Sequence, residues 1–194
     1  MSKSRLPKPA KLVVGCFTKE KDIFSDVGKE LAQSFGPPDV ISPWIPFEQT
    51  DYYEPEMGAP LFRRLMAFRD LIEQESLADM KLFTNELEDR FSIQGKRAVN
   101  IDPGYLLAER FVLATGKNFT HRIYLRAGIY ADLTLIYHKG GFRALDWTYP
   151  DYGGREIISF LKSVRDRYMY QMRQATGSTY LSRASRSNER LLTG

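Results

Sequence analysis

The hydrophobic positions of the chain alternate between strand-like and helix-like spacing. Residues 11–17 are apolar and β-branched, which indicates a buried first strand. From 22 to 35 apolar residues recur every three or four positions, and Gly36 with the prolines at 37–38 ends that pattern, so we predict a helix. The next segment, 40–47, contains two prolines, which is typical of an edge strand.

The middle of the chain is less regular. Residues 48–60 are polar and aromatic together, and predict a loop. The apolar spacing of 61–72 fits a helix, but the same residues can also extend beside the first strand, so this segment has two interpretations. Residues 77–91 carry one apolar stripe that includes Phe83 and Leu87, which predicts a helix with Phe83 buried.

The last third of the chain predicts mostly strands. Residues 97–101 are expected to form a strand that leads into a turn at Asp102-Pro103-Gly104, and 105–114 are apolar enough for the core in either conformation. Glycines at 140 and 141 favour a hairpin between the last two of three short strands. These strands are 122–125, 129–138 and 142–147. A closing helix is expected over 157–170.

This order of elements predicts an α+β fold. Strand, helix, strand, ambiguous segment, helix, strand is the order of a ferredoxin-like βαββαβ unit, here extended by an antiparallel β meander and a C-terminal helix. With 194 residues the chain has the size of one domain. We predict a basic N-terminal arm over 1–10, a single α+β domain over 11–172, and a disordered Ser/Arg-rich tail over 173–194.

Composition excludes several classes of protein. The chain is 43% hydrophobic and 13% aromatic, which is too rich for a disordered chain. No run approaches the roughly 18 apolar residues that span a membrane, and no cleavage site follows the N-terminal apolar run. Cys16, the single cysteine, cannot form an internal disulfide. We therefore expect a cytoplasmic protein with no membrane partner.

The formal net charge of +4 belongs to the two ends of the chain. Residues 1–11 carry four Lys or Arg and no acidic residue, while 165–194 carry six Arg against two acidic residues. The segment between them is net acidic. Nucleic acid is therefore a candidate partner through the basic ends alone, and the sequence carries no signal of the oligomeric state.

The common catalytic and nucleotide-binding motifs are absent. The chain has no Walker loop, dinucleotide glycine fingerprint, CxxC pair, HExxH or GxSxG. With one cysteine and two histidines, no zinc site is expected. Cys16 is not expected to act as a nucleophile, because an apolar strand destabilises a thiolate.

Polar residues instead gather in predicted turns and strand ends between 81 and 152. Asp102 follows a strand, where a carboxylate can accept a substrate proton, although Asp before Pro-Gly more often caps its own turn. His121 heads a strand whose apolar residues alternate inward, and Asp132 lies on the polar face of a later strand. We assign these three as candidate catalytic residues. Asp102 with Asp132 can also hold Mg²⁺, which is the cofactor that these two carboxylates suggest.

A second set of residues is assigned to ligand binding. Lys117 and Arg122 belong to a cluster around a loop that contains Gly116, and such a loop can hold an anion with help from backbone amides. Lys81 and Asn85 are placed on the polar side of the predicted middle helix. Asp151 completes the set, in an aromatic stretch whose rings are expected to pack.

Six blocks of sequence carry most of these residues. They are TDYYEPEMG (50–58), KLFTNELE (81–88), VNIDPGYL (99–106), VLATGKNFTHRIYL (112–125), GIYADLTLIY (128–137) and WTYPDY (147–152). In this order they resemble an uncharacterised bacterial family, domain of unknown function 4416, over about 11–168. The family usually has glutamate at the position of Asp132, which keeps the charge. The resemblance implies a stand-alone cytoplasmic bacterial protein and no particular activity.

Two classes of function follow from these observations, with a third alternative. The first is a protein that binds or processes a small anionic ligand, such as a nucleotide or another phosphate compound, and whether it is an enzyme is left open. For this class we expect Asp102, His121 and Arg122 to meet on one concave surface. The second is an RNA-binding or ribonucleoprotein-associated module. The alternative to both is a structural or partner protein without a ligand site.

Overall fold

The computed structural model describes residues 3–191, with side chains described as far as Ala175. Its helices are α1 (Ile23–Phe35), α2 (Glu54–Met57), α3 (Leu77–Arg90) and α4 (Arg155–Leu191), with a 3₁₀ turn, η1 (Gln74–Ser76), before α3. Its strands are β1 (Ala10–Thr18), β2 (Pro38–Ile41), β3 (Ile45–Pro46), β4 (Phe62–Ile72), β5 (Val99–Leu106), β6 (Arg110–Thr115), β7 (Arg122–Arg126), β8 (Ile129–His138) and β9 (Gly141–Ala144). The fold is α+β, as predicted.

The strands form one antiparallel sheet in the order β2-β4-β1-β5-β6-β8-β7. Off this path, β3 pairs with β4 and β9 pairs with β8. β1 is buried along its whole length, because β4 pairs with it on one side and β5 on the other. The ferredoxin-like description of the segment from β1 to β5 stays a prediction.

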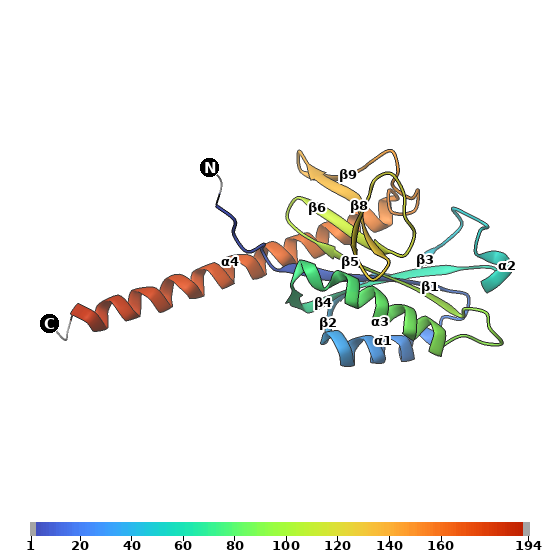
Figure 1. Cartoon of the computed structure of the whole chain (residues 1–194), viewed down its shortest axis with the longest axis horizontal. Helices are drawn as coiled ribbons and strands as arrows, with labels where there is room; N and C mark the ends of the chain where they lie inside the picture. The colour runs from blue at the N-terminus through green and yellow to red at the C-terminus, as the bar shows by residue number, and fades with distance from the viewer. Residues whose placement is uncertain (1–2, 192–194) are drawn as a thin grey trace.

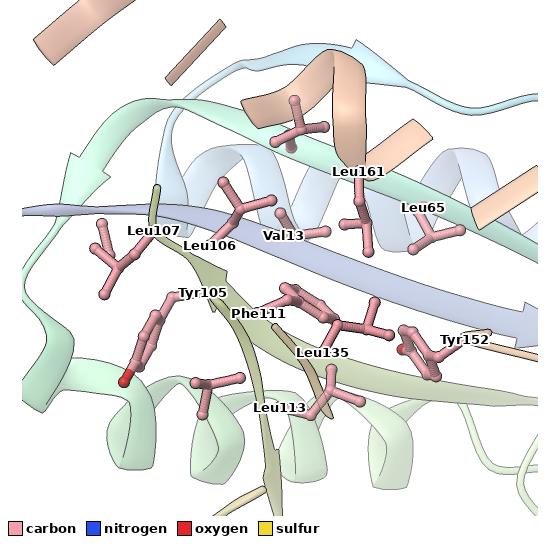
Figure 2. Packing of buried hydrophobic residues seen from close by; sticks show 14 of the residues in the cluster. Val13, Leu65, Tyr105, Leu106, Leu107, Phe111, Leu113, Leu135, Tyr152 and Leu161 are labelled. Atoms are coloured by element: carbon pink, nitrogen blue, oxygen red, sulfur yellow. The ribbon is translucent and has the colours of Figure 1, made fainter. Parts of the chain in front are cut away.

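Helices cover both faces of the sheet around β1 (Figure 1). α1 and α3 lie side by side on one face, where Leu12 of β1 packs in one cluster with Leu31 and Leu87. α4 crosses the opposite face, and Figure 2 shows Val13 and Leu161 in the core on that side. Because successive side chains of a strand point to opposite faces, β1 contributes to both cores.

The ambiguous segment 61–72 is the strand β4. Its side chains alternate between the two cores: Leu65 joins the cluster on the α4 side, and Met66 and Phe68 join the cluster beside α1 and α3. A strand buried on both faces is apolar at nearly every position. This is why its hydrophobic pattern could not be told from that of a helix.

The prediction of a turn at Asp102-Pro103-Gly104 is wrong, because these residues lie within β5. β5 runs through these residues without a break and pairs with β1 along its whole length, with Gly15 opposite Asp102. Gly104 permits close packing between strands, since a Cβ there would lie 2.5 Å from the carbonyl oxygen of Val112. Asp102 is therefore held on a rigid strand and is not a turn residue.

α4 is much longer than the helix predicted over 157–170. Its backbone is helical to Leu191, where the sequence predicted a disordered tail from 173, and Figure 1 shows this part projecting beyond the sheet. The segment has one glycine and no proline, so little in it breaks a helix. Residues 192–194 lie outside the described residues. Among the helices of residues 3–191, none is long and apolar enough to cross a membrane.

A buried lysine joins the two ends of the domain. Lys11 of β1 is fully buried, and its Nζ donates to Asp39 of β2 at 2.7 Å and to Gln171 of α4 at 2.9 Å. Nearby, the hydroxyl of Tyr168 in α4 donates to the carbonyl oxygen of Pro9. Burial lowers the pKa of Lys11, and the hydrogen bond to Asp39 opposes that shift.

Candidate functional site

A cleft of about 690 Å³ gathers polar side chains from α3, from strands β4, β5, β6, β7 and β8, and from the loops at 47–53 and 149–152. Seven of the eight residues assigned from the sequence line it. They are Lys81, Asn85, Asp102, Lys117, Arg122, Asp132 and Asp151. The eighth, His121, contacts one of these seven. Residues that are up to 70 positions apart in the sequence thus share one concave surface.

The cleft lies where the sheet is interrupted between β5 and β6. These strands pair only over the last residues of β5, from Gly104 onward, so the first half of β5 has no strand neighbour on that side. α3 covers this edge. Lys81 Nζ donates to the carbonyl oxygen of Ile101 at 2.8 Å, and the Ile101 N–H donates to Glu88 Oε1 at 2.7 Å. Two side chains therefore supply the hydrogen bonds that a further strand would have made.

The buried face of α3 differs from the predicted one. Lys81 and Glu88, predicted to face away from the core, are buried, and Phe83 is only half-buried, with its ring against Phe35. Lys81 Nζ lies 3.7 Å from Glu88 Oε1. Burial raises the pKa of Glu88, and the charge of Lys81 opposes that shift. Lys81 is thus part of the fold as well as of the cleft.

Asp102 is the carboxylate of the cleft that is most open to a ligand. Its side chain is 26% exposed, whereas those of the other lining carboxylates are 7–11% exposed. Asp102 Oδ2 accepts a hydrogen bond from Asn100 Nδ2 at 2.8 Å, and Oδ1 lies 3.7 Å from Lys81 Nζ. The oxygen Oδ1 therefore retains capacity to accept from a ligand.

Asp132 holds His121 and Arg122 together. Its Oδ2 accepts a hydrogen bond from Arg122 Nε at 2.9 Å and lies 3.1 Å from His121 Nε2. Because an ionised carboxylate only accepts, we infer that Nε2 carries the proton. The imidazole stacks on Trp147 with ring centroids 4.8 Å apart. His121 does not line the cleft, so its contact with the site runs through Asp132.

Lys117 is the exposed cation of the cleft. Its Nζ lies 3.4 Å from the hydroxyl of Tyr52 and 4.8 Å from that ring's centroid, so two distant loops meet here. Within the described side chains it is the lining cation with no carboxylate within 4.0 Å. Arg122 Nη1 donates to the backbone oxygen of Lys117 at 2.9 Å, which fixes the loop.

Arg63 is a cleft residue that the sequence did not single out. It is only 4% exposed, and its guanidinium carbon lies 4.7–5.1 Å from the ring centroids of Phe17, Phe47 and Tyr152. Nη1 is 3.0 Å from Asp151 Oδ2. Burial acts to lower the pKa of Arg63, but Tyr152 and Asp151 raise it above the ordinary value. The available signal was a pair of arginines inside an apolar segment.

Arg97 is a second cleft residue that the sequence did not single out, and it connects Glu56 of α2 to Asn100 of β5. From Nε and Nη2 it donates to both carboxylate oxygens of Glu56, at 2.8 and 2.7 Å, and from Nη1 to Asn100 Oδ1 at 2.9 Å. These bonds lower the pKa of Glu56 and raise that of Arg97. Tyr52 and Tyr53, just before α2, are thereby tied to β5.

Two further predictions concern metal binding and the chemistry of the single thiol. Within the described residues, no group of three or more His, Cys, Asp or Glu is arranged to hold a metal ion, so Mg²⁺ on Asp102 and Asp132 stays a prediction. Cys16 is buried, as predicted, and burial raises the pKa of its thiol. A thiolate nucleophile at Cys16 is therefore disfavoured.

Comparison with known proteins identifies the family of the chain. A family model described as Domain of unknown function (DUF4416) covers residues 8–168. This range includes every strand of the sheet and every residue that lines the cleft. Neither the curated proteins nor the solved structures contain a match to the chain.

Proposed function

We propose that this chain, which belongs to the family of the domain of unknown function DUF4416, binds a small anionic molecule in its cleft. The class of ligand is a nucleotide or another phosphate-containing compound. The observation that carries the proposal is the convergence of charged side chains from separate elements on one concave surface. Burying so many charges opposes folding, so their arrangement around a cleft favours a ligand as its reason.

The size of the cleft fits a small molecule. Ligand pockets in proteins commonly measure about 300–1,000 Å³, and this one, at about 690 Å³, falls within that range. Phe47, Tyr52, Tyr53 and Tyr149 line it beside the charged groups. Aromatic rings give a planar ligand group a surface for stacking.

The anionic group of the ligand is assigned to the loop at Lys117. Among the described side chains, no carboxylate lies within 4.0 Å of the ammonium of this lysine, and the residue is exposed. The side chain of Arg122 is 8% exposed, and it donates hydrogen bonds to Asp132 and to the backbone oxygen of Lys117. Burial acts to lower the pKa of Arg122, but hydrogen bonds to Tyr149 and Asp132 raise it, so the charge is permanent.

Asp102 is assigned the opposite role. Its free carboxylate oxygen is placed to accept a hydrogen bond or a proton from the ligand. Asp132 is already occupied by His121 and Arg122, and therefore orients those two side chains. In this proposal His121 is a positioning residue for Asp132.

An RNA-binding role is less well supported than a small-molecule role. Single-stranded RNA commonly stacks on the aromatic face of an open sheet. Here Ile157, Leu161 and Val164 of α4 pack against one face, and α1 and α3 cover the other around β1. The carboxylates in the cleft would also repel a polyanion.

The test is a thermal-shift screen of the full-length protein. The probes are nucleoside mono-, di- and triphosphates, pyrophosphate and inorganic phosphate, each with and without Mg²⁺. A compound that binds only the native state stabilises it by about 2.7 kcal/mol at a concentration of 100 times Kd. We expect a rise in melting temperature that is reduced in Lys117→Ala and retained in Lys162→Ala, a matched change of an exposed lysine on α4.

Two results would contradict the proposal. One is that none of these compounds raises the melting temperature. The other is an equal loss of the shift in Lys117→Ala and Lys162→Ala, which would place binding outside the cleft.

A further inference from the structure

One side of the cleft contains buried polar atoms that lack hydrogen-bond partners. Among the described side chains these include Nε of Arg63 and the hydroxyl of Tyr152, beside the ion pair in which Arg63 Nη1 lies 3.0 Å from Asp151 Oδ2. All three residues line the cleft. An unsatisfied buried donor or acceptor costs about 1–3 kcal/mol, so two such atoms beside one buried ion pair call for an explanation.

The chain brings these groups together by leaving space at Gly15 of β1. A Cβ at this position would lie 3.0 Å from the Tyr152 hydroxyl and 3.9 Å from Arg63 Nη1. The ring of Tyr152 packs in the hydrophobic core (Figure 2), which fixes where its hydroxyl lies. We refer to Arg63, Asp102, Asp151 and Tyr152 as the inner wall.

The inner wall presents donors and acceptors together. Arg63 only donates, and the carboxylates of Asp102 and Asp151 only accept. Burial raises the pKa of the Tyr152 hydroxyl, so it stays protonated and can do both. The ion pair between Arg63 and Asp151 balances their charges, whereas Asp102 adds a further negative charge at its rim.

This mixture favours an uncharged group that both donates and accepts hydrogen bonds. A phosphate or carboxylate only accepts hydrogen bonds, and it would be repelled by Asp102 and Asp151. An ammonium only donates, and it would be repelled by Arg63. A hydroxyl group donates once and accepts twice, so it can pair with both kinds of neighbour without a charge of its own.

From this arrangement we infer that the inner wall binds the hydroxyl groups of a sugar, while the loop at Lys117 binds a phosphate attached to that sugar. The ligand class is thus a phosphorylated sugar, either free or within a nucleotide. This inference rests on the proposed function and adds the second recognition element to it. Because Arg63, Asp151 and Tyr152 line the cleft, a sugar bound there can pair with them directly or through one bound water.

The test compares ligands that differ only in sugar hydroxyls. Affinities of the full-length protein are measured by calorimetry for AMP and for its 2′,3′-dideoxy counterpart. We expect the dideoxy compound to bind about tenfold more weakly or worse, since two hydrogen-bonding groups are lost. Ribose 5-phosphate and pyrophosphate are measured beside them. Binding of ribose 5-phosphate comparable to that of AMP identifies the free sugar phosphate as sufficient, and much weaker binding identifies a nucleotide.

The variant Tyr152→Phe links the effect to the inner wall. It removes one buried hydroxyl that meets the geometry of a hydrogen bond with none of the described residues, so we expect the unliganded protein to melt at the same or a higher temperature. The same variant should lower the affinity for AMP severalfold and leave the affinity for the dideoxy compound unchanged. If the role of Tyr152 is purely structural, Tyr152→Phe should lower the melting temperature and the affinities for both ligands.

The outcomes separate the two proposals. Equal affinity for AMP and its dideoxy counterpart, or an equal loss of both in Tyr152→Phe, overturns the sugar subsite. Pyrophosphate binding that depends on Lys117 would then still support the proposed function. If neither AMP, ribose 5-phosphate nor pyrophosphate binds, the anion site fails and the sugar subsite fails with it.

Discussion

Arg63 and Lys81 hold positive charges inside the protein by different means. The guanidinium of Arg63 lies among aromatic rings with one carboxylate neighbour, Asp151. The ammonium of Lys81 has a backbone carbonyl and two carboxylates nearby. A buried charge that loses its partner is costly, so these residues respond differently to the loss of a single neighbour.

Replacing Asp151 tests the dependence of Arg63 on its counterion. Asp151→Asn should destabilise the protein by about 3 kcal/mol, because it leaves the guanidinium buried without an opposite charge. The free energy of unfolding is measured by urea denaturation. Asp146→Asn is the matched control, since Asp146 is exposed, and it should change stability by less than about 0.5 kcal/mol. Similar values for both variants would show that the aromatic rings alone stabilise the cation.

Two glycines offer a comparison of close packing. Gly104→Ala should cost about 1–3 kcal/mol or more, because its Cβ would lie 2.5 Å from a backbone oxygen on β6. Gly116→Ala should have a much smaller effect, since no atom lies within 4 Å of a Cβ there. Thermal unfolding of both variants checks this. Equal changes in the two variants would show that the contact with β6 contributes little to the cost at Gly104.

The ion pair between Glu56 and Arg97 should make the free energy of unfolding depend on pH. Hydrogen bonds from Arg97 lower the pKa of Glu56 below its ordinary value of 4.5. The stabilisation is therefore present above that value and is lost as pH falls through the lowered pKa. Glu56→Gln should be less stable than the natural chain at pH 7, and the difference should shrink as the pH is lowered below 4.5. Urea denaturation across this range measures it, and a constant difference would contradict the assignment.

At the scale of elements, the edge of β5 depends on α3. Lys81 and Glu88 form an ion pair, but each also bonds the backbone of Ile101. Lys81→Met should therefore destabilise by about 3–5 kcal/mol, the usual cost of breaking a buried pair.

The double variant Lys81→Met with Glu88→Leu separates the two contributions. Replacing a whole buried ion pair by apolar residues is often neutral. Here it leaves the N–H and C=O of Ile101 without their partners, so we expect the double variant to remain destabilised by at least 2 kcal/mol, roughly the cost of two unsatisfied groups. Recovery of full stability in urea denaturation would show that the backbone contacts contribute little.

Elements with one buried face were predictable from the sequence. α1 follows its apolar spacing closely, and the hairpin between β8 and β9 follows its glycines. β4 was ambiguous because it is apolar on both faces. The sequence Asp-Pro-Gly at 102–104 favours a turn locally, but pairing with β1 holds it extended, and this tertiary effect has no local signal.

The candidate site was predictable to the extent that its residues lie in polar blocks. Asp102 and Lys117 stand out in the sequence, and both line the cleft. Arg63 and Arg97 did not, because their importance comes from neighbours distant in sequence: Asp151 for the first and Glu56 for the second. Contacts across 41 residues or more cannot be derived from spacing along one chain.

At the scale of the whole molecule, α4 combines a part that packs on the sheet with a part that extends beyond it (Figure 1). The packed part includes Leu161 and Tyr168, and Gln171 bonds Lys11. We expect a chain ending at Ala175 to keep the melting temperature of the full chain within about 2 °C, because these contacts remain. A chain ending at Phe160 should fail to unfold cooperatively. A loss of several degrees in the first chain would show that the extended part contributes to stability.

The position of α4 also bears on protein synthesis. Lys11 lies in the first strand, but its partner Gln171 and the helix that covers Val13 leave the ribosome only after every strand of the sheet. Until then the nascent chain exposes one apolar face of its sheet, the kind of surface that chaperones bind and that promotes aggregation. Asp151 and Tyr152 emerge almost as late. A ligand that needs them can therefore stabilise only nascent chains that have been translated beyond Tyr152.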